Sequence, residues 1–301
     1  MRSSLLNDSR ISRLVELALM EDVGMGDVTS DAIIPEDALG EAELLCKEDG
    51  VIAGLELAAL VFQYCDHGIT LTPAVHDGDR AARGATIAAV NGPAKGILKG
   101  ERTALNFLQR MSGIATITKR YVDAVAGTNA KITDTRKTVP GLRVLDKWAV
   151  RLGGGVNHRF GLDDMVLIKD NHIVAAGGIA SAVQRCLHRL GEQRCTVKIE
   201  VETKNLDEVQ EALRTRGIDR IMLDNFPLSQ MREAVQLIAH AVEVEASGGV
   251  TLENVRAIAE TGVDFISVGA LTHSAPAADF SLELIRDRTE APPARALPRN
   301  G

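Results

Sequence analysis

The stretch TVKIEVETKNLDEVQEALRTRGIDRIMLD, residues 196–224, decides the fold of most of this chain. A β-type apolar run at 196–202 is followed by an amphipathic helical pattern and by a second apolar run at 220–224. Strand, helix and strand in that order predict two parallel strands joined by a right-handed crossover. Each of the two runs ends on a carboxylate, Glu202 or Asp224, so the pattern also predicts acidic groups where the strands end.

The same unit recurs through the second half of the chain. Strands are predicted at 131–135, 165–170, 196–202, 220–224, 241–247 and 264–269. Helical patterns separate most of these strands, and polar residues end nearly all of them. A parallel α/β barrel accommodates this series better than a doubly wound sheet, because the first strand, KITDT, is not followed by a GxGxxG turn.

The first hundred residues have a different pattern of predicted secondary structure, with short strands and tight turns. Strands are predicted within 42–51 and 69–90, and helices at 9–22, 51–65 and 100–126. We expect Ser9 to cap the first helix and Gly113 to break the last one into two segments. This alternation predicts a small α+β domain, and residues 286–301 are predicted to form a frayed tail.

Composition excludes several classes of protein. The chain has 301 residues and a formal net charge of −7, and only 3% of the residues are aromatic, which argues against non-specific nucleic-acid binding. No apolar run approaches the ~18 residues of a membrane span, and we do not expect the first residues to act as a secretory signal or a transit peptide. The cysteines form no metal-type spacing, so we expect reduced, packed thiols in a cytoplasmic protein at Cys46, Cys65, Cys186 and Cys195.

Cationic side chains concentrate in one part of this acidic chain. The candidates are Arg136, Lys137, His158, Arg159 and Lys169. Guanidinium forks bind carboxylates in a bidentate manner, so the cluster suits a small substrate with two carboxylates, or a sugar phosphate. The glycine run GGGVNHRFG, at 153–161, lies between them and allows the backbone to approach an anion closely.

Acidic candidates complement these cations. Glu200 and Asp224 at the strand ends suit the hydroxyls of a ribose and a Mg²⁺ ion bound to a pyrophosphate. Glu202 shares a strand face with Glu200, since side chains alternate along a strand. The SGG run at 247–249 and the run VGALTHS at 268–274 follow the last two strands, where barrels commonly hold a phosphate.

Several long runs resemble the quinolinate phosphoribosyltransferase family. They are ERTALNFLQRMSGIAT (101–116), DTRKTVPGLR (134–143), GGGVNHRFGLDDMVLIKDNHI (153–173), IEVE (199–202), IMLDN (221–225), EASGG (245–249) and ISVGALTHS (266–274). EDVGMGDVTS and CKEDGVIAG near the start extend the likeness, which covers nearly the whole chain. A paralogue associated with molybdenum transport shares this fold and is the main alternative.

The resemblance implies a two-domain α/β architecture. Residues 1–113 would form an N-terminal α/β sandwich domain completed by residues 275–301, and residues 114–274 an open parallel barrel of six or seven strands. It also implies a homodimer or a dimer-based hexamer. Arg102 is then expected to cross from one subunit into the site of its partner.

The resemblance assigns roles to individual residues. The positions expected to hold the substrate's carboxylates and neighbouring phosphates are Arg136, Lys137, His158, Arg159 and Lys169. Glu200 and Asp224 are expected to bind ribose hydroxyls and Mg²⁺, and with Lys137 they are the catalytic candidates. The 5′-phosphate is expected at Ser247, Gly248, Gly249, Gly269 and Ala270. The segment between Glu200 and Asp224 is slightly longer than the family pattern, so the choice between Glu200 and Glu202 stays open.

The reaction implied is transfer of phosphoribose from phosphoribosyl pyrophosphate to quinolinate, with loss of CO₂, in NAD biosynthesis. It would use Mg²⁺ and no organic cofactor, because the quaternised pyridinium itself accepts the electrons of decarboxylation. A phosphoribosyltransferase for nicotinic acid would need fewer cations, since its substrate has one carboxylate. The molybdenum-associated paralogue would use another acceptor, and a non-catalytic anion-binding module would tolerate loss of Glu200 and Asp224.

Overall fold

The computed structural model describes residues 6, 8–193 and 195–285, and the chain divides into two compact units. Unit 1 comprises residues 1–112 and 277–301, and unit 2 comprises residues 113–276. The tail predicted at 286–301 lies outside the described residues. None of the helices in the described part is long and apolar enough to cross a membrane.

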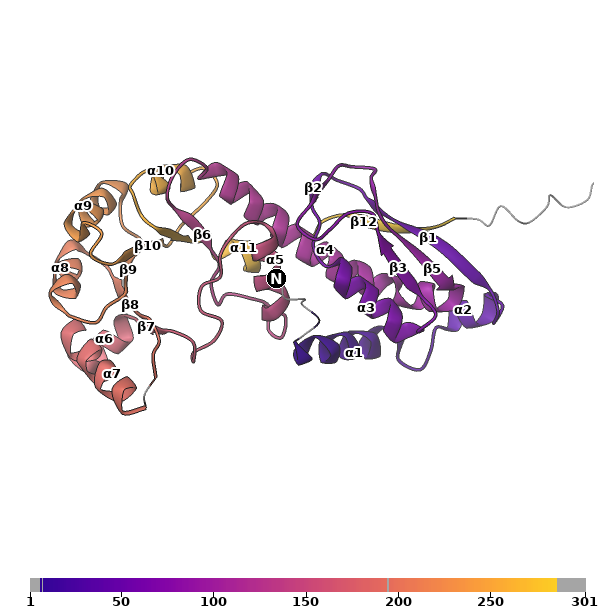
Figure 1. The fold of residues 1–301 in the computed structure, drawn as a ribbon, viewed down its shortest axis with the longest axis horizontal. Coiled ribbons are helices and arrows are strands. Elements are labelled where there is room, and N and C mark those ends of the chain that lie inside the picture. Colours follow the sequence, from indigo (N-terminus) through magenta and orange to yellow (C-terminus); the bar gives the residue numbers. More distant parts are fainter. Residues whose placement is uncertain (1–5, 7, 194, 286–301) are drawn as a thin grey trace, which may run out of the picture. The chain divides into compact units, whose positions relative to one another are not determined.

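Unit 1 contains a four-stranded antiparallel sheet in the order β12-β1-β5-β3 and a two-stranded ribbon of β2 and β4. Its strands are β1 (Leu39–Cys46), β2 (Gly50–Val51), β3 (Thr70–Pro73), β4 (Arg80–Ala81), β5 (Thr86–Pro93) and β12 (Phe280–Ile285). Its helices are α1 (Ser9–Val23), α2 (Val28–Ile33) and α3 (Leu55–Cys65), together with the first part of α4 (Ala94–Ala124). Because β12 pairs with β1, residues near the C-terminus belong to the sheet of this unit (Figure 1).

Two local predictions for this region are wrong. Asp8, rather than Ser9, caps α1, because its carboxylate accepts a hydrogen bond from the backbone N–H of Arg10. Helix α4 continues through Gly113 without a break. A glycine costs ~1 kcal/mol relative to alanine in a helix, less than the ~1.5–3 kcal/mol gained by burying one large apolar side chain. Met111 and Ile114 are both fully buried beside it.

Unit 2 is built on a six-stranded parallel sheet, as the repeated pattern predicts. The strands, in the order β6-β11-β10-β9-β8-β7, are all parallel to their neighbours. Their bounds are β6 (Lys131–Thr133), β7 (Val166–Ile168), β8 (Ile199–Thr203), β9 (Arg220–Asp224), β10 (Glu243–Ser247) and β11 (Phe265–Ser267). In the described part, β6 and β7 do not pair with each other, so the barrel is open between them.

Helices cover the outer side of this curved sheet. They include α6 (Asp170–Ala176), α7 (Ile179–Gln193), α8 (Leu206–Arg214), α9 (Leu228–Ile238) and α10 (Val255–Ala259), which Figure 1 shows outside the strands. Unit 2 also contains α5 (Arg143–Leu152), α11 (Ala270–His273) and the second part of α4. All five residues of β8 are buried, so the sheet forms the core and its carboxyl ends share one rim.

The cysteines are free, as the absence of paired spacing predicts. Cys46 is buried and Cys65 and Cys186 are half-buried, but Cys195 is exposed. The expectation of a packed thiol is therefore wrong for Cys195, which follows α7 on the surface of unit 2.

Candidate active site

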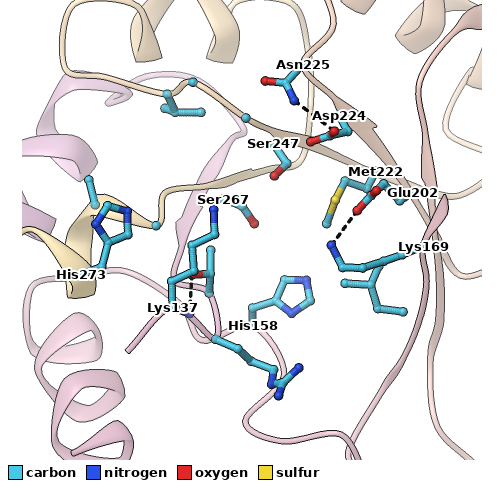
Figure 2. A pocket seen from close by; sticks show the side chains of 18 of the residues that line it. Lys137, His158, Lys169, Glu202, Met222, Asp224, Asn225, Ser247, Ser267 and His273 are labelled. Carbon is cyan, nitrogen blue, oxygen red and sulfur yellow. Dashed lines mark hydrogen bonds and ion pairs between the residues drawn. The ribbon is translucent and has the colours of Figure 1, made fainter. Parts of the chain in front are cut away.

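A cavity of about 740 Å³ lies within unit 2 at the carboxyl ends of its strands (Figure 2). This volume suits a small-molecule ligand, since such pockets commonly measure ~300–1,000 Å³. The predicted site residues that line it are Arg136, Lys137, His158, Arg159, Lys169, Asp224, Ser247, Gly248, Gly249, Gly269 and Ala270. Glu200 and Arg102 are not among the lining residues. Arg102 lies exposed on α4, within unit 1.

The segment after β6 presents two exposed cations. In the described part of the chain, no carboxylate lies within ion-pair distance of Arg136 or Lys137. The backbone beneath them is held, because the Lys137 N–H donates to Thr135 and the Thr272 hydroxyl donates to the Lys137 carbonyl at 2.7 Å. Fixed backbone with uncompensated charge at the tips favours an anionic ligand.

Two further cationic side chains, Arg159 and Lys169, also line the pocket. Figure 2 shows the side chains of Lys137 and Lys169 on opposite sides, with the His158 ring between them in this view. Burial lowers the pKa of Arg159, and the neighbouring Arg136 lowers it further. Since two guanidinium groups repel each other, an anion bound between them would be stabilised by both.

Lys169 is paired with an acid that the sequence left as an alternative. Its Nζ lies 2.7 Å from Oε2 of Glu202, and Glu202 lines the pocket. Glu200 is two residues earlier on β8 and is completely buried. Two residues advance a strand by ~7 Å, so the two side chains share a face but differ in depth. The geometry therefore favours Glu202 over Glu200 as the carboxylate that faces a ligand.

Beneath the cations, a buried ion pair anchors the loop that carries His158. Lys147 Nζ pairs with Asp134 and donates to the His158 carbonyl at 3.0 Å. The side-chain amide of Asn157 donates to Asp134 at 2.6 Å, and the backbone N–H of His158 donates to the same carboxylate at 2.9 Å. With three kinds of donor, Asp134 is a structural acid, although the strand pattern also placed it at the rim.

A second buried cluster lies under the pocket and contains Glu200. Its Oε2 lies 3.0 Å from Nε2 of His158, and Oε2 of Glu245 lies 3.5 Å from the same nitrogen. Glu245 also pairs with Arg220 at 2.8 Å and accepts a hydrogen bond from the Ser267 hydroxyl. Burial raises the pKa of both Glu200 and Glu245 to about 7, and for Glu245 the nearby charge of Glu200 contributes to the rise.

The ends of β9 and β10 form the other side of the pocket. Asp224 accepts a hydrogen bond of 3.0 Å from the side-chain amide of Asn225. Asn225, Gly248 and Gly249 all have positive φ angles. A Cβ added at Gly248 would lie only 2.2 Å from Oδ1 of Asn225, so this glycine allows the two strand ends to approach.

Some lining residues were not singled out from the sequence. They include Thr135, Leu167, Met222, Ser267 and His273. Met222 precedes Asp224 by two positions on β9, so alternation along the strand could have found it. His273 lies in α11, beyond the strand end, and no periodic signal points to it.

Two kinds of metal ligand set are possible in these residues. Glu202 and Asp224 offer carboxylate oxygens at the pocket surface. Among the described residues, ligand atoms of His158, Glu200 and Glu245 also lie within 4.8 Å of one another; His158 borders the pocket, but both glutamates of this set are completely buried. Only the first set can reach a metal carried by a ligand in the pocket.

Comparisons with known proteins agree along almost the whole chain. The family models "Quinolinate phosphoribosyl transferase, N-terminal domain" and "C-terminal domain" match residues 27–112 and 114–283. The chain is 49% identical over 289 residues to a nicotinate-nucleotide pyrophosphorylase [carboxylating], chloroplastic, of Arabidopsis thaliana, covering 91% of this chain and 82% of the relative. A relative from Synechocystis, named as probably the same enzyme, is 46% identical over 272 residues, covering 89% and 90%.

Solved structures show the same likeness. The nicotinate-nucleotide pyrophosphorylase from Francisella tularensis superposes with a TM-score of 0.86 at 39% identity, covering 92% of this chain and 96% of that one. The agreement in fold includes the small N-terminal sheet and the six-stranded parallel sheet with its helices.

Proposed function

The chain belongs to the quinolinate phosphoribosyltransferase family, and we propose that the pocket in unit 2 is where it performs this family's reaction. The reaction converts quinolinate and phosphoribosyl pyrophosphate into nicotinate mononucleotide, pyrophosphate and CO₂, a step of NAD biosynthesis. One observation carries the assignment to this pocket. Uncompensated cations and pocket-facing carboxylates lie around a single cavity, as one anionic and one sugar-diphosphate substrate require.

The cationic side of the pocket suits the dicarboxylate. Arg136 and Arg159 would each hold a carboxylate of quinolinate, because a guanidinium fork matches a carboxylate in two parallel hydrogen bonds. Lys169, which lies beside Glu202 at 2.7 Å, would add a further positive charge where the two substrates meet. A substrate with one carboxylate would leave one of these cations without a partner.

The acidic side suits phosphoribosyl pyrophosphate. Asp224 and Glu202 would accept hydrogen bonds from the ribose hydroxyls. The 5′-phosphate would lie on the segments 247–249 and 269–270, whose backbone at Gly248 and Gly249 has the left-handed conformation that allows close approach.

The donor set at this side also fits Mg²⁺, which prefers carboxylate oxygens and substrate phosphates as ligands. Asp224 and Glu202 would hold the ion, and when bound it would neutralise negative charge on the pyrophosphate. Glu200 is too deeply buried for this role, so we assign it to Glu202.

The transfer step needs orientation and electrostatic stabilisation more than proton transfer. The lone pair of the pyridine nitrogen forms a bond to C1 of the ribose, while the C1–O bond to pyrophosphate breaks and its electrons leave with the oxygen. Positive charge develops on the ribose in the transition state, and the carboxylates of Asp224 and Glu202 lie on the side where the ribose would bind. Arg136 and Arg159, through the carboxylates of quinolinate, would hold the ring nitrogen in line.

Decarboxylation follows on the quaternised ring. The bond between C2 and its carboxylate breaks, CO₂ leaves, and the electron pair stays at C2 beside the positive ring nitrogen until a solvent proton adds there. Lys137 is our candidate for the nearby cation, since its side chain lies across Gly269, where an added Cβ would be 3.2 Å from Cδ of Lys137.

The oligomeric state of the chain is a further part of the proposal. We propose that the chain works as a homodimer or a dimer-based hexamer, with Arg102 completing the site of a partner subunit. Mixing Arg102→Ala with Asp224→Ala subunits should then restore activity in mixed dimers that neither variant has alone.

The four free thiols suit a reducing compartment, and a cytoplasmic location stays a prediction, because the Arabidopsis relative is named as chloroplastic.

The reaction is tested with quinolinate labelled at the 2-carboxylate. We expect labelled CO₂ and nicotinate mononucleotide only when phosphoribosyl pyrophosphate and Mg²⁺ are both present. Omitting each reactant in turn, and offering nicotinic acid and other pyridines side by side, identifies the acceptor. A folded protein that binds phosphoribosyl pyrophosphate but releases no CO₂ would contradict the proposal and indicate another acceptor.

A further inference from the structure

The buried cluster under the pocket contains two acids that the reaction does not use. Glu200 and Glu245 have no exposed surface, and both face Nε2 of His158. The His158 side chain is itself only 6% exposed, although it borders the pocket. We propose that these two acids are positioning residues, which hold His158 as a neutral imidazole that in turn orients Arg159.

The hydrogen-bond pattern determines the tautomer. The backbone N–H of Arg159 donates to Nδ1 of His158 at 2.8 Å, so Nδ1 carries no hydrogen. Nε2 then carries the hydrogen and donates to Oε2 of Glu200 at 3.0 Å. Both ring nitrogens are occupied, and a second proton on Nδ1 would oppose the Arg159 N–H. The protein itself therefore holds the His158 ring at both nitrogens.

The hydrogen-bond partners of Glu200 and Glu245 fit a role in holding the His158 ring. In the described part of the chain, His158 is the N–H donor to Glu200, and Oε1 of Glu200 has no hydrogen-bond partner. Glu245 is held by Arg220 at 2.8 Å and by a hydrogen bond from the Ser267 hydroxyl. A metal ion in this cluster would need Nε2 without its hydrogen and Glu245 without Arg220. The geometry therefore favours a support for His158 over a cation site.

The two acids act on Arg159 through the His158 ring, which is bonded to the Arg159 backbone. The His158 ring accepts from the Arg159 backbone, and the Lys147–Asp134 pair holds the other side of the same loop. The Arg159 guanidinium also donates a hydrogen bond of 3.4 Å to the Met165 carbonyl. The His158 ring thus fixes the backbone of Arg159, and the backbone in turn sets the direction in which the Arg159 side chain leaves the loop.

Substitution at Glu200 tests this role, which rests on the proposed binding of quinolinate by Arg159. Glu200→Leu removes the acceptor for Nε2–H, and we expect the KM for quinolinate to rise about tenfold, as for loss of one charge-assisted hydrogen bond, while the KM for phosphoribosyl pyrophosphate changes less than about twofold. Glu200→Gln should recover most of this loss, because its amide oxygen still accepts. Glu243→Leu is the matched control, since Glu243 pairs with Arg220 at 3.0 Å but, among the described residues, makes no ion pair or hydrogen bond with His158, and it should leave both KM values unchanged.

Nitrogen NMR of ¹⁵N-histidine protein reads the tautomer directly, with His158→Asn to assign the signal. We expect a neutral ring with hydrogen on Nε2, unchanged when quinolinate saturates the enzyme. An imidazolium in the complex, a hydrogen on Nδ1, or equal kinetic losses in the Glu200→Leu, Glu200→Gln and Glu243→Leu variants would overturn the inference. If Glu200→Leu fails to fold, the tautomer of the unsubstituted enzyme still decides it. Absence of CO₂ release would instead refute the proposed function and leave the tautomer result intact.

Discussion

Replacing Gly248 with alanine should disturb the end of β10 and, through it, the place of Asp224. A Cβ at this position would lie 2.2 Å from Oδ1 of Asn225, and the φ angle of Gly248 is +94°. The backbone conformation opposes any L side chain, and the approach is far inside van der Waals contact. Asn225 must therefore move, and its hydrogen bond to Asp224 is lost.

The size of the effect follows from these two terms. Left-handed backbone costs a non-glycine residue ~1–2 kcal/mol. Loss of the 3.0 Å hydrogen bond between Asn225 and Asp224 adds ~1 kcal/mol, a modest value because the pair is exposed. If the sum of ~2–3 kcal/mol falls on binding of phosphoribosyl pyrophosphate, kcat/KM for this substrate should fall by about 30- to 150-fold.

Gly249→Ala is the matched control, since Gly249 has φ +60° but no atom within 4 Å of an added Cβ. This variant should show the strain alone, a loss of about tenfold. Steady-state kinetics with each substrate varied in turn, together with thermal melting to verify folding, measures the difference. The reasoning is refuted if Gly248→Ala is no worse than Gly249→Ala, or if the KM for quinolinate rises as much as that for phosphoribosyl pyrophosphate.

Three further predictions concern the two sides of the pocket and the acids below it. Arg136→Ala should weaken quinolinate binding by ~2 kcal/mol, the lower end of the range for stranding a charge, because this guanidinium is exposed; an unchanged KM for quinolinate would remove Arg136 from the site. Asp224→Ala should raise the KM for phosphoribosyl pyrophosphate and the requirement for Mg²⁺ while quinolinate binding, measured by calorimetry, is spared; equal loss of both would indicate misfolding. The raised pKa of Glu245, about 7 against an ordinary 4.5, means that its protonated form is favoured in the folded state, so its contribution to stability is fully present below pH ~4.5 and is lost as the pH rises through ~7. Glu245→Gln should reduce this fall in unfolding free energy but not abolish it, because the pKa of Glu200 is also raised to about 7; parallel curves for the two proteins would contradict the assignment.

The parallel direction of the strands in unit 2 could be predicted from the sequence alone, whereas the opening between β6 and β7 could not. Apolar runs such as 220–224, separated by amphipathic helices, have one arrangement that buries both faces of each strand, and it is a parallel sheet covered by helices. Since parallel strands end on one rim, residues at those ends, such as Asp224 and Lys169, could be expected to meet in one site. Individual boundaries were less accurate, because the burial of neighbours keeps α4 helical through Gly113.

Only the tertiary structure decided how deep each side chain lies and what it bonds. Glu200 and Glu202 occupy the same strand face and look equivalent in the sequence, but the packing of neighbouring strands buries one and leaves the other at the pocket. His158 belongs to a cationic run, yet its ring nitrogens are both occupied, by the Arg159 backbone and by Glu200, which is 42 residues away. Periodicity along one chain reports which face a residue is on, whereas depth and hydrogen-bond partners depend on segments that meet only after folding.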